Sequence, residues 1–402
     1  WDKDDCEDLG IIKVDLLGLG MMAAIEDTLK LCSERGHPVD LATIPKDDAA
    51  TYEMMQVADT VGVFQIESRA QMATLPRMKP RDFYDVVIEV AIIRPGPIVG
   101  KMVHPYLNRR SGKEKIDYIA DCFEPILKRT LGVPLFQEQV LQMAMLIADF
   151  NGSEAEELRR AMSFHRSDER MAKVMAKLRA AMNRKGVALE VQERVVLSIQ
   201  SFALYGFPES HAISFALLAY ASVWLKVHRA VEFYAALLNN QPMGFYSRAT
   251  LVRDAKLRGI TVRPVCIVQS SLVCTVEADN VLRLGLNQLN GISRHALHRI
   301  ISERERHPWR DLNDFLLRCF LSKDERRVLA SSGVLNALGH HRRSALWEVE
   351  EVREPDLFTY AAAATSKPST LATMSPTERV EADYQTVSLT TGPQPMVYVR
   401  SQ

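Results

Sequence analysis

The sequence predicts a mainly α-helical protein with a small α+β part. Between about residues 45 and 245 the apolar side chains recur at helical spacing, and strand-like runs are few. Residues 246–285 change character, because 262–265 and 281–285 are short branched runs typical of strands. The 402 residues, 47% hydrophobic and 25% charged, are typical of a globular chain of roughly two to three domains and exclude a wholly disordered or fibrous one.

Charge and cysteine usage narrow the function classes. Lys and Arg together number 50, as do Asp and Glu, so any nucleic-acid site has to be a local basic patch. Six cysteines without CxxC spacing indicate reduced thiols in a cytoplasm. The chain begins without a start methionine or a signal-peptide pattern, so we expect a segment of something longer. The apolar stretch 210–225 is shorter than the roughly 20 residues of a membrane span, so we expect a buried helix and no membrane.

The first predicted elements are a strand and a helix. Residues 11–17 alternate weakly and are rich in branched side chains, which is typical of a strand, and Gly18 and Gly20 end it. Residues 22–34 have the spacing of a helix, which the Gly-His-Pro sequence at 36–38 stops.

Further helices are predicted in the middle of the chain. Residues 138–149 place their apolar side chains on one stripe. Ser153 and Glu156 form a capping-box pattern that predicts the start of the next helix. Residues 170–184 combine an apolar face with a basic stripe, and a long helix is expected after Pro208. Beyond the two short strands, 286–348 form a compact helical segment, and the composition from about 349 onward predicts a linker.

Lys13 and Asp15 are the first candidate site residues. Residues i and i+2 of a strand point to the same face, so this cation would lie next to the carboxylate. A carboxylate at a strand end is a usual anchor for a hard divalent ion such as Mg²⁺. A surface ion pair is the alternative interpretation.

Two basic segments are candidate phosphate contacts. Arg94 begins a stretch, residues 94–115, with six Lys or Arg against one acid, and its Pro-Gly-Pro turn lets backbone approach a ligand closely. Arg159 and Arg160 are adjacent on a predicted helix, and the planar guanidinium fork matches phosphate oxygens. The alternatives are a solvated loop for the first and pairing with the neighbouring acids Glu156 and Glu157 for the second.

A turn at 289–293 leads into an apolar-periodic helix. Gly291 in such a turn, followed by the backbone N–H groups of Ile292, Ser293 and Arg294 at a helix start, suits an anion. This geometry is typical of a helix-hairpin-helix that grips a DNA phosphate without reading sequence. A weaker match to the same turn pattern follows around Gly333. Residues 283–343 contain twelve Lys or Arg and six acids, so the region is locally basic. An ordinary helix-turn-helix corner is the alternative.

His211 lies after the Pro208 break. Without a cysteine or carboxylate partner at a telling spacing, its pattern favours a structural role over a base or a ligand. The sequence has neither a GxxxxGK[ST] nor a GxGxxG pattern, so nothing favours other nucleotide-binding enzymes.

Several of these motifs resemble, in family order, the bacterial C-family DNA polymerases, the DNA polymerase III alpha subunit family. Residues 13–19 resemble the second palm motif. Six further segments resemble the fingers region of this family: 62–69 (Gly-Val-Phe-Gln-Ile-Glu-Ser-Arg), 94–97, 136–140, 158–162, 205–207 and 210–211. Residues 1–5, 102–107, 164–167, 169–171 and 381–384 are similar to the error-prone branch of the family.

The resemblance implies four segments and an activity. The segments are the end of a palm at 1–21, a helical fingers domain at 22–245, a helix-hairpin-helix DNA-binding domain at 246–348, and a linker at 349–402 toward an OB domain. The implied activity is template-directed addition of deoxynucleoside triphosphates to a primer 3′ end on a primed DNA template, with release of pyrophosphate, in a bacterial cytoplasm. Two Mg²⁺ ions held by aspartates would stabilise the attacking and leaving oxygens.

Site roles are implied position by position. Asp15 would be the third metal-binding aspartate, with Lys13 beside it. The incoming triphosphate would contact Arg159 and Arg160, with Arg94 in the same cleft. The DNA duplex would lie on Gly291, Ile292, Ser293, Arg294 and Gly333.

One departure from the family pattern limits what this chain is expected to do alone. The family's other two metal aspartates lie upstream of the segment that begins here. We therefore expect an incomplete metal site and no polymerisation by the isolated chain. The alternative function is a non-catalytic DNA-binding or scaffold module. Accessory damage-tolerance proteins or a sliding clamp are further partners that only the resemblance implies.

Overall fold

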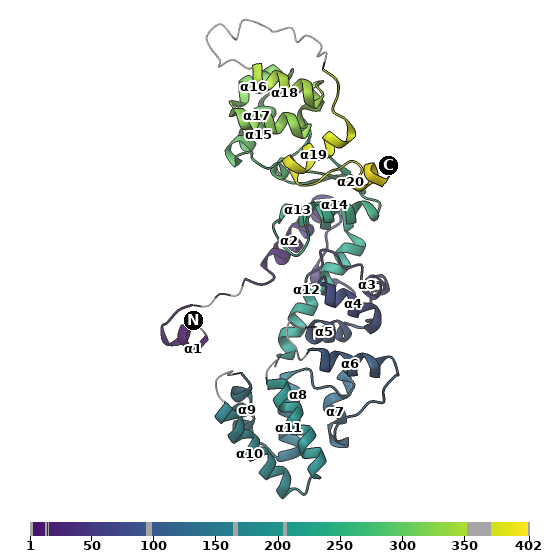
Figure 1. The fold of residues 1–402 in the computed structure, drawn as a ribbon, viewed down its shortest axis with the longest axis vertical. Helices are drawn as coiled ribbons and strands as arrows, with labels where there is room; N and C mark the ends of the chain where they lie inside the picture. The colour runs from purple at the N-terminus through teal and green to yellow at the C-terminus, as the bar shows by residue number, and fades with distance from the viewer. Residues whose placement is uncertain are drawn as a thin grey trace. The chain divides into compact units, whose positions relative to one another are not determined.

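A computed structural model describes residues 3–12, 14, 16–93, 99–163, 168–203, 207–351 and 371–400. The chain divides into two compact units (Figure 1). We call Leu41–Val227 the central unit, and Trp1–Asp40 together with His228–Gln402 the terminal unit. The described elements of the central unit are all helices, and the terminal unit adds one small sheet. The predicted fold class, mainly α with a small α+β part, is confirmed.

Ten α-helices make up the described part of the central unit, and the last of them runs one residue past its boundary. They are α3 (Ala49–Gln56), α4 (Arg69–Met78), α5 (Phe83–Ile92), α6 (Val99–Arg110), α7 (Glu124–Leu127), α8 (Gln137–Ala148), α9 (Gly152–Ser163), α10 (Asp168–Arg184), α11 (Leu189–Ala203) and α12 (Glu209–His228).

Polar side chains fix where the first of these helices begin. Asp48 caps α3 by accepting the N–H of Thr51 at 2.9 Å. Ser68 and Gln71 form a capping box at the start of α4, which satisfies two backbone donors that a helix start leaves open. Asp82 caps α5 in the same way as Asp48 caps α3.

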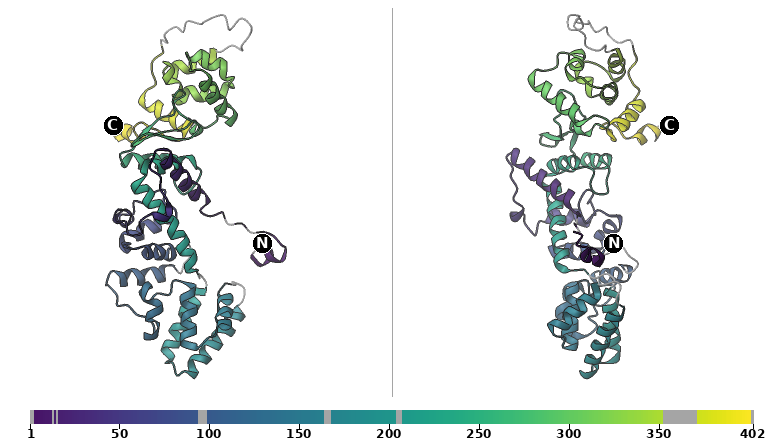
Figure 2. Two further views of the ribbon diagram at one scale, coloured as in Figure 1. Left: turned by 180° about the vertical axis from the view of Figure 1, so that it is seen from behind. Right: turned by 90° about the vertical axis from the view of Figure 1, so that its left-hand side faces the viewer.

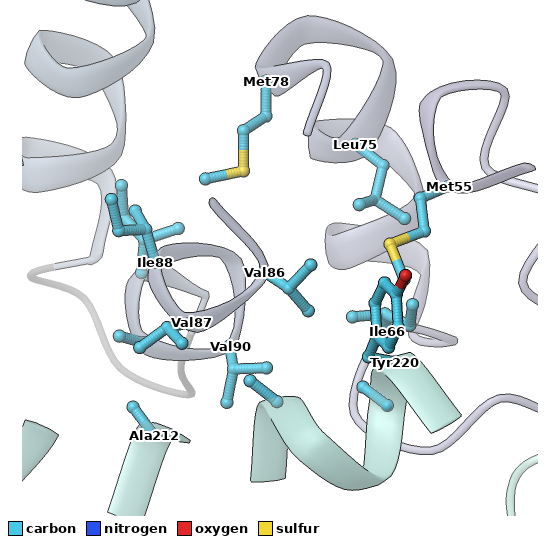
Figure 3. Close-up of a cluster of buried hydrophobic side chains, with 14 of the residues drawn as sticks. Met55, Ile66, Leu75, Met78, Val86, Val87, Ile88, Val90, Ala212 and Tyr220 are labelled. Carbon is cyan, nitrogen blue, oxygen red and sulfur yellow. The ribbon is translucent and has the colours of Figure 1, made fainter. Parts of the chain in front are cut away.

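One core of the central unit surrounds α5. All residues of this helix from Asp85 to Ile92 are buried, so α5 buries two acids, Asp85 and Glu89, together with its apolar side chains. Figure 3 shows Val86, Val87 and Val90 of α5 in one cluster with Ala212 and Tyr220 of α12. The cluster also takes Met55 from α3 and Leu75 and Met78 from α4.

A second core lies between α8, α9, α10 and α11, which Figure 2 draws in blue-green. The predicted apolar stripe of α8 is confirmed, since Val140, Met143, Ala144 and Ile147 are all buried in this cluster. The predicted apolar face of α10 is buried there too, as Val174, Met175, Leu178 and Met182.

The start of α9 differs from the prediction. The helix begins at Gly152, and its cap is Asn151, whose Oδ1 accepts the N–H of Glu154 at 3.0 Å. In return, the Asn151 N–H donates to the Glu154 carboxylate at 3.1 Å. The capping box therefore lies two residues before the predicted pair of Ser153 and Glu156. Both positions fit the same sequence pattern, and the earlier one captures the first free N–H groups.

The terminal unit combines helices from both ends of the chain. Its helices are α1 (Lys3–Asp8), α2 (Leu19–Glu34), α13 (Ala230–Asn239), α14 (Arg248–Leu257), α15 (Arg294–Arg306), α16 (Leu312–Cys319), α17 (Lys323–Ser332), α18 (Arg342–Glu351), α19 (Pro376–Val387) and α20 (Pro395–Arg400). Its strands are β1 (Thr261–Arg263), β2 (Thr275–Ala278) and β3 (Val281–Arg283).

The sheet has the order β1-β3-β2. β3 pairs parallel with β1, with Val262 opposite Leu282, and antiparallel with β2. The two predicted strands, at 262–265 and 281–285, are thus present in shortened form. β2 was not predicted, because its four residues are at most half-buried and lack a strong alternating pattern.

Helix α2 packs against α13, about two hundred residues later in the chain (Figure 1). Arg35 Nε pairs with Glu232 at 2.9 Å, and Asn240 Nδ2 donates to Asp27 at 2.7 Å. The predicted helix at 22–34 is confirmed and begins three residues earlier. Both helices belong to the terminal unit, so the units divide the chain at other places than the predicted segment boundaries.

The predicted strand at 11–17 is wrong for the residues described there. Residues 11, 12, 14 and 16 lie outside any strand, and Ile12 is 86% exposed. A strand needs a hydrogen-bonded neighbour, and the described residues form no other sheet than β1-β3-β2.

The predicted linker is wrong for residues 371–400. These residues form α19 and α20, and α19 packs on α17. Arg342 Nη2 bonds Asp383 Oδ1 at 2.6 Å, and the Asn290 N–H donates to the Thr386 carbonyl at 2.7 Å. The Ser, Thr and Pro content of this segment is typical of a loop, but it forms the short helix α19, which these polar contacts hold against the rest of the terminal unit.

Among the described helices, α12 alone is long and apolar enough to cross a membrane by length and composition. Its buried side chains, such as Ala212, Ala216 and Ala219, belong to the core around α5. The helix expected after Pro208 is confirmed, but it is buried only in part, and Leu217 is 54% exposed.

Candidate nucleic-acid interface

Three predicted site residues, Lys13, Asp15 and Arg94, lie outside the described residues. Among the residues that are described, no three His, Cys, Asp or Glu side chains lie close enough to hold a metal ion. The described residues thus do not form the Mg²⁺ site that the resemblance implies.

Arg159 and Arg160 lie on the exposed side of α9 and share one carboxylate. Arg159 binds Glu156 through Nε and Nη2, both at 2.8 Å, and Arg160 Nε binds the same side chain at 3.0 Å. The two guanidinium groups lower the pKa of Glu156 to about 2. The structure therefore brings the two arginines together, in the local ion pair that was the alternative to phosphate contact. Exposed pairs of this kind contribute little to stability.

Two arginines of the basic stretch at 94–115 bind neighbouring acids and carbonyls. Arg110 forms a two-pronged bond with Asp85, at 2.6 Å for each nitrogen, and also binds the Lys79 carbonyl. Arg109 pairs with Glu114 and donates to the Leu131 carbonyl at 2.9 Å. These two arginines fasten α6 to its surroundings.

The turn before α15 has the geometry expected of a hairpin. Gly291 adopts a φ of 80°, a conformation that other residues rarely take. Ser293 caps α15 by accepting the N–H of Ala296 at 3.2 Å. We call residues 290–293 the hairpin turn.

An acid from another helix occupies this turn. Glu325 Oε1 accepts the Ser293 N–H at 3.1 Å and the Ser293 hydroxyl at 2.8 Å. Asn290 is also engaged, through its N–H to Thr386 and through its Nδ2 to the Ser388 hydroxyl at 2.8 Å. Sequence reasoning missed both contacts, because the partners lie 32 to 98 residues away.

Unpaired basic side chains follow the turn on α15. Arg294, His295 and His298 are exposed, and within the described part of the chain none of them forms an ion pair. Their spacing puts them on adjoining parts of one helix surface. Together with Gly291 and Ser293, which are also exposed, they form a basic surface that a phosphate backbone can reach.

Gly333 lies beneath a side chain instead of at an open turn. A Cβ at this position would lie 2.6 Å from Arg342 Nε. That arginine is the one that binds Asp383 and the Arg379 carbonyl. The structure gives Gly333 a packing reason: only glycine leaves room for the guanidinium group, and its φ of 80° also favours glycine.

Aromatic rings form a row at the start of α12. The exposed ring of His211 lies between Phe207, at 4.9 Å, and Phe215, at 4.4 Å, and Phe215 contacts Phe64 at 5.4 Å. The Phe207 carbonyl accepts the Gln137 N–H at 3.0 Å, which fixes the entry to the helix. The i, i+4, i+8 spacing could have revealed this row from the sequence.

A basic surface beside a glycine turn at a helix start, in a mainly helical chain, is typical of nucleic-acid-binding proteins. Residues 21–186 match the family model of the bacterial DNA polymerase III alpha subunit finger domain, and residues 259–345 match that of a helix-hairpin-helix motif. The chain belongs to the bacterial DNA polymerase III alpha subunit family and to its error-prone branch.

Curated relatives support this placement along the whole chain. The chain is 46% identical over 413 residues to an error-prone DNA polymerase of Alkalilimnicola ehrlichii, a match that covers all of this chain and 40% of that protein. It is 44% identical over 410 residues to one from Pseudomonas aeruginosa, again all of this chain and 40% of the relative. For Methylococcus capsulatus the values are 45% over 378 residues, 88% of this chain and 36% of the relative. The chain thus spans about 40% of the length of such relatives.

Proposed function

We propose that this chain is the fingers and helix-hairpin-helix portion of an error-prone DNA-directed DNA polymerase. In the whole protein it would bind primed DNA and position the incoming deoxynucleoside triphosphate for template-directed addition to the primer, in the bacterial cytoplasm. The observation that carries this proposal is the identity of 44 to 46% with error-prone DNA polymerases over the entire chain. The open basic surface beside the hairpin turn supports the DNA contact.

The DNA contact would be electrostatic and independent of base sequence. Backbone N–H groups and arginines that touch phosphates orient a duplex without reading it. Each phosphate neutralised releases counterions, so the affinity falls steeply with salt. Arg294, exposed at the first turn of α15, is the side chain best placed for such a contact.

We expect Arg294→Ala to weaken binding of primed DNA and to reduce the slope of log affinity against log salt by about 0.9, the contribution of one phosphate contact. Fluorescence anisotropy with a labelled primed template over a range of salt concentrations measures both quantities. Arg253→Ala is the matched control, because Arg253 is an exposed arginine of α14 outside the residues that match the hairpin family. Equal losses in both variants would contradict the assignment.

The nucleotide contact would use the arginine pair of α9. A triphosphate would have to draw Arg159 and Arg160 away from Glu156, and the exposure of this ion pair makes the exchange inexpensive. Charge-assisted bonds from arginine to phosphate are among the stronger hydrogen bonds in proteins.

We expect Arg159→Ala to lower the affinity for a deoxynucleoside triphosphate about tenfold, the equivalent of one charge-assisted contact. Titration calorimetry measures the change, and Arg179→Ala on the exposed surface of α10 provides the comparison. Unchanged affinity in the Arg159 variant would remove the α9 pair from the nucleotide site.

The proposal as a whole is tested on the complete chain with primed template, Mg²⁺ and all four triphosphates. Salt-dependent DNA binding supports the polymerase portion, and its absence would contradict the proposal. Primer growth by the chain alone would contradict the expectation of an incomplete metal site. That expectation, the roles of Asp15, Lys13 and Arg94, and contacts with a clamp or accessory proteins stay predictions.

A further inference from the structure

Glu325 connects the starts of two helices in the terminal unit. Its Oε1 accepts both the N–H and the hydroxyl of Ser293 at the hairpin turn, at 3.1 and 2.8 Å. Its Oε2 accepts the Ser322 N–H at 3.0 Å, which closes the capping box of α17. One carboxylate therefore satisfies backbone donors at the N-termini of both α15 and α17.

The position of this carboxylate coincides with the place where a phosphate would bind the hairpin turn. A phosphate oxygen at a helix start takes its hydrogen bonds from the same N–H groups and gains from the same helix dipole. The bonds to Ser293 and Ser322 outweigh the burial of the Glu325 side chain and lower the pKa of its carboxyl, so the group carries its negative charge at neutral pH. A DNA phosphate that approaches Ser293 therefore meets a bound anion.

We propose that Glu325 is a built-in competitor of DNA at the hairpin turn, so that a duplex phosphate has to displace it to bind Ser293. This inference rests on the proposed DNA contact at the same turn and adds its regulation. Wild-type affinity for DNA is then set below what the basic surface of Arg294, His295 and His298 would give alone. The competition lowers the affinity for DNA. The carboxylate is also part of the fold, because it closes the capping box of α17.

Glu325→Gln separates the charge from the cap. Glutamine is accepted at this position of a capping box, so α17 keeps its start. The variant loses the anion and keeps one acceptor oxygen, which is enough for the bond from the Ser322 N–H, so we expect its affinity for primed DNA to rise about 3- to 10-fold at fixed salt. A gain in affinity cannot result from unfolding, and Glu325→Ala, which also removes the hydrogen bonds, is expected to show a gain as well.

Glu378→Gln is the matched control. Glu378 also closes a capping box, with Ser375 at the start of α19, and also carries a lowered pKa. It binds Arg343 at 2.5 Å and accepts the Ser375 N–H, so its loss removes the same charge without opening the hairpin turn. We expect less than about a twofold change in this variant, since a single exposed charge acts weakly at moderate salt.

Anisotropy titrations of wild type and the three variants decide the question. A gain in both Glu325 variants that exceeds the Glu378 control supports the inference. Salt-dependent binding by the wild type without such a gain overturns the inference alone, and a loss in both Glu325 variants would mean that the carboxylate prepares the turn for DNA. Absence of salt-dependent binding in every sample overturns both the inference and the proposed DNA contact.

Discussion

Replacing Glu89 with leucine is expected to stabilise the central unit by about 1–3 kcal/mol at pH 8, the cost of a buried polar group that lacks a hydrogen-bond partner. Glu89 is completely buried on α5, and neither of its carboxylate oxygens has a hydrogen-bond partner in the described structure. Burial raises the pKa of this carboxyl well above its ordinary value of 4.5. The folded protein must therefore protonate it or keep an unpaired charge.

The sign of the pH dependence follows from the raised pKa. Between 4.5 and the folded-state pKa the folded protein binds the proton more than the unfolded chain does, so stability falls as the pH rises through this window. The advantage of Glu89→Leu should accordingly be larger at pH 8 than at pH 5. Native-state hydrogen exchange of the α5 amides measures it for this unit alone, which a global unfolding curve of two units would not.

Glu53→Leu is the comparison, because Glu53 is an exposed glutamate of the neighbouring α3. It should change stability by less than about 0.5 kcal/mol, as surface substitutions usually do. A Glu89→Leu variant that is less stable than the wild type at pH 8 would indicate that the acid has a favourable partner in solution.

The helices could be predicted from the sequence because burial follows the helical period. The stripe of Val140, Met143, Ala144 and Ile147 on α8 is an example, since every member is buried. The strand at 11–17 could not be judged in the same way, because a strand depends on a neighbour that local spacing does not specify. The tail helix α19 was missed although Ser375 and Glu378 form a capping box at its start, because the Ser, Thr and Pro content of the segment favoured a linker.

In the candidate site, too, local contacts could be predicted from the sequence and contacts between residues far apart in the chain could not. The pairing of Arg159 and Arg160 with Glu156 could be anticipated as an alternative, because residues three and four apart on a helix are neighbours. The turn at Gly291 was recognisable from its glycine and the following cap. The contact of Glu325 with Ser293 joins residues 32 apart, and no local pattern contains it.

Replacing Lys226 with methionine is expected to destabilise the central unit by about 3 kcal/mol, the cost of leaving two partly buried carbonyls unsatisfied. The Lys226 side chain on α12 is 0% exposed. Its Nζ donates to the Val61 carbonyl at 2.8 Å and to the Asp59 carbonyl at 3.3 Å. It therefore holds the loop at 59–67, which includes Gln65 at a φ of 68°.

Glu67 should add to the loss of stability in Lys226→Met, because the positive charge of Lys226 favours the ionised form of the Glu67 carboxyl. Burial raises the pKa of Glu67 to about 7, against a smaller opposing effect of the Gly62 N–H and of Lys226. Without the ammonium group the pKa of Glu67 should rise further. The Lys226→Met variant should then lose more stability at pH 8 than at pH 5, since more of the penalty of the buried carboxylate falls on the folded state.

Two comparisons identify the backbone bonds as the source of the effect. Lys128→Met, at a lysine that is 73% exposed, should be nearly neutral. Asp59→Asn should cost less than about 1 kcal/mol, because the Asp59 carboxylate is 41% exposed and 3.4 Å from Nζ. Hydrogen exchange of the amides at 59–67 should speed up in Lys226→Met and stay slow in the other two variants. If Asp59→Asn loosened the loop as much as Lys226→Met, the ion pair and not the carbonyls would be the contact that holds it.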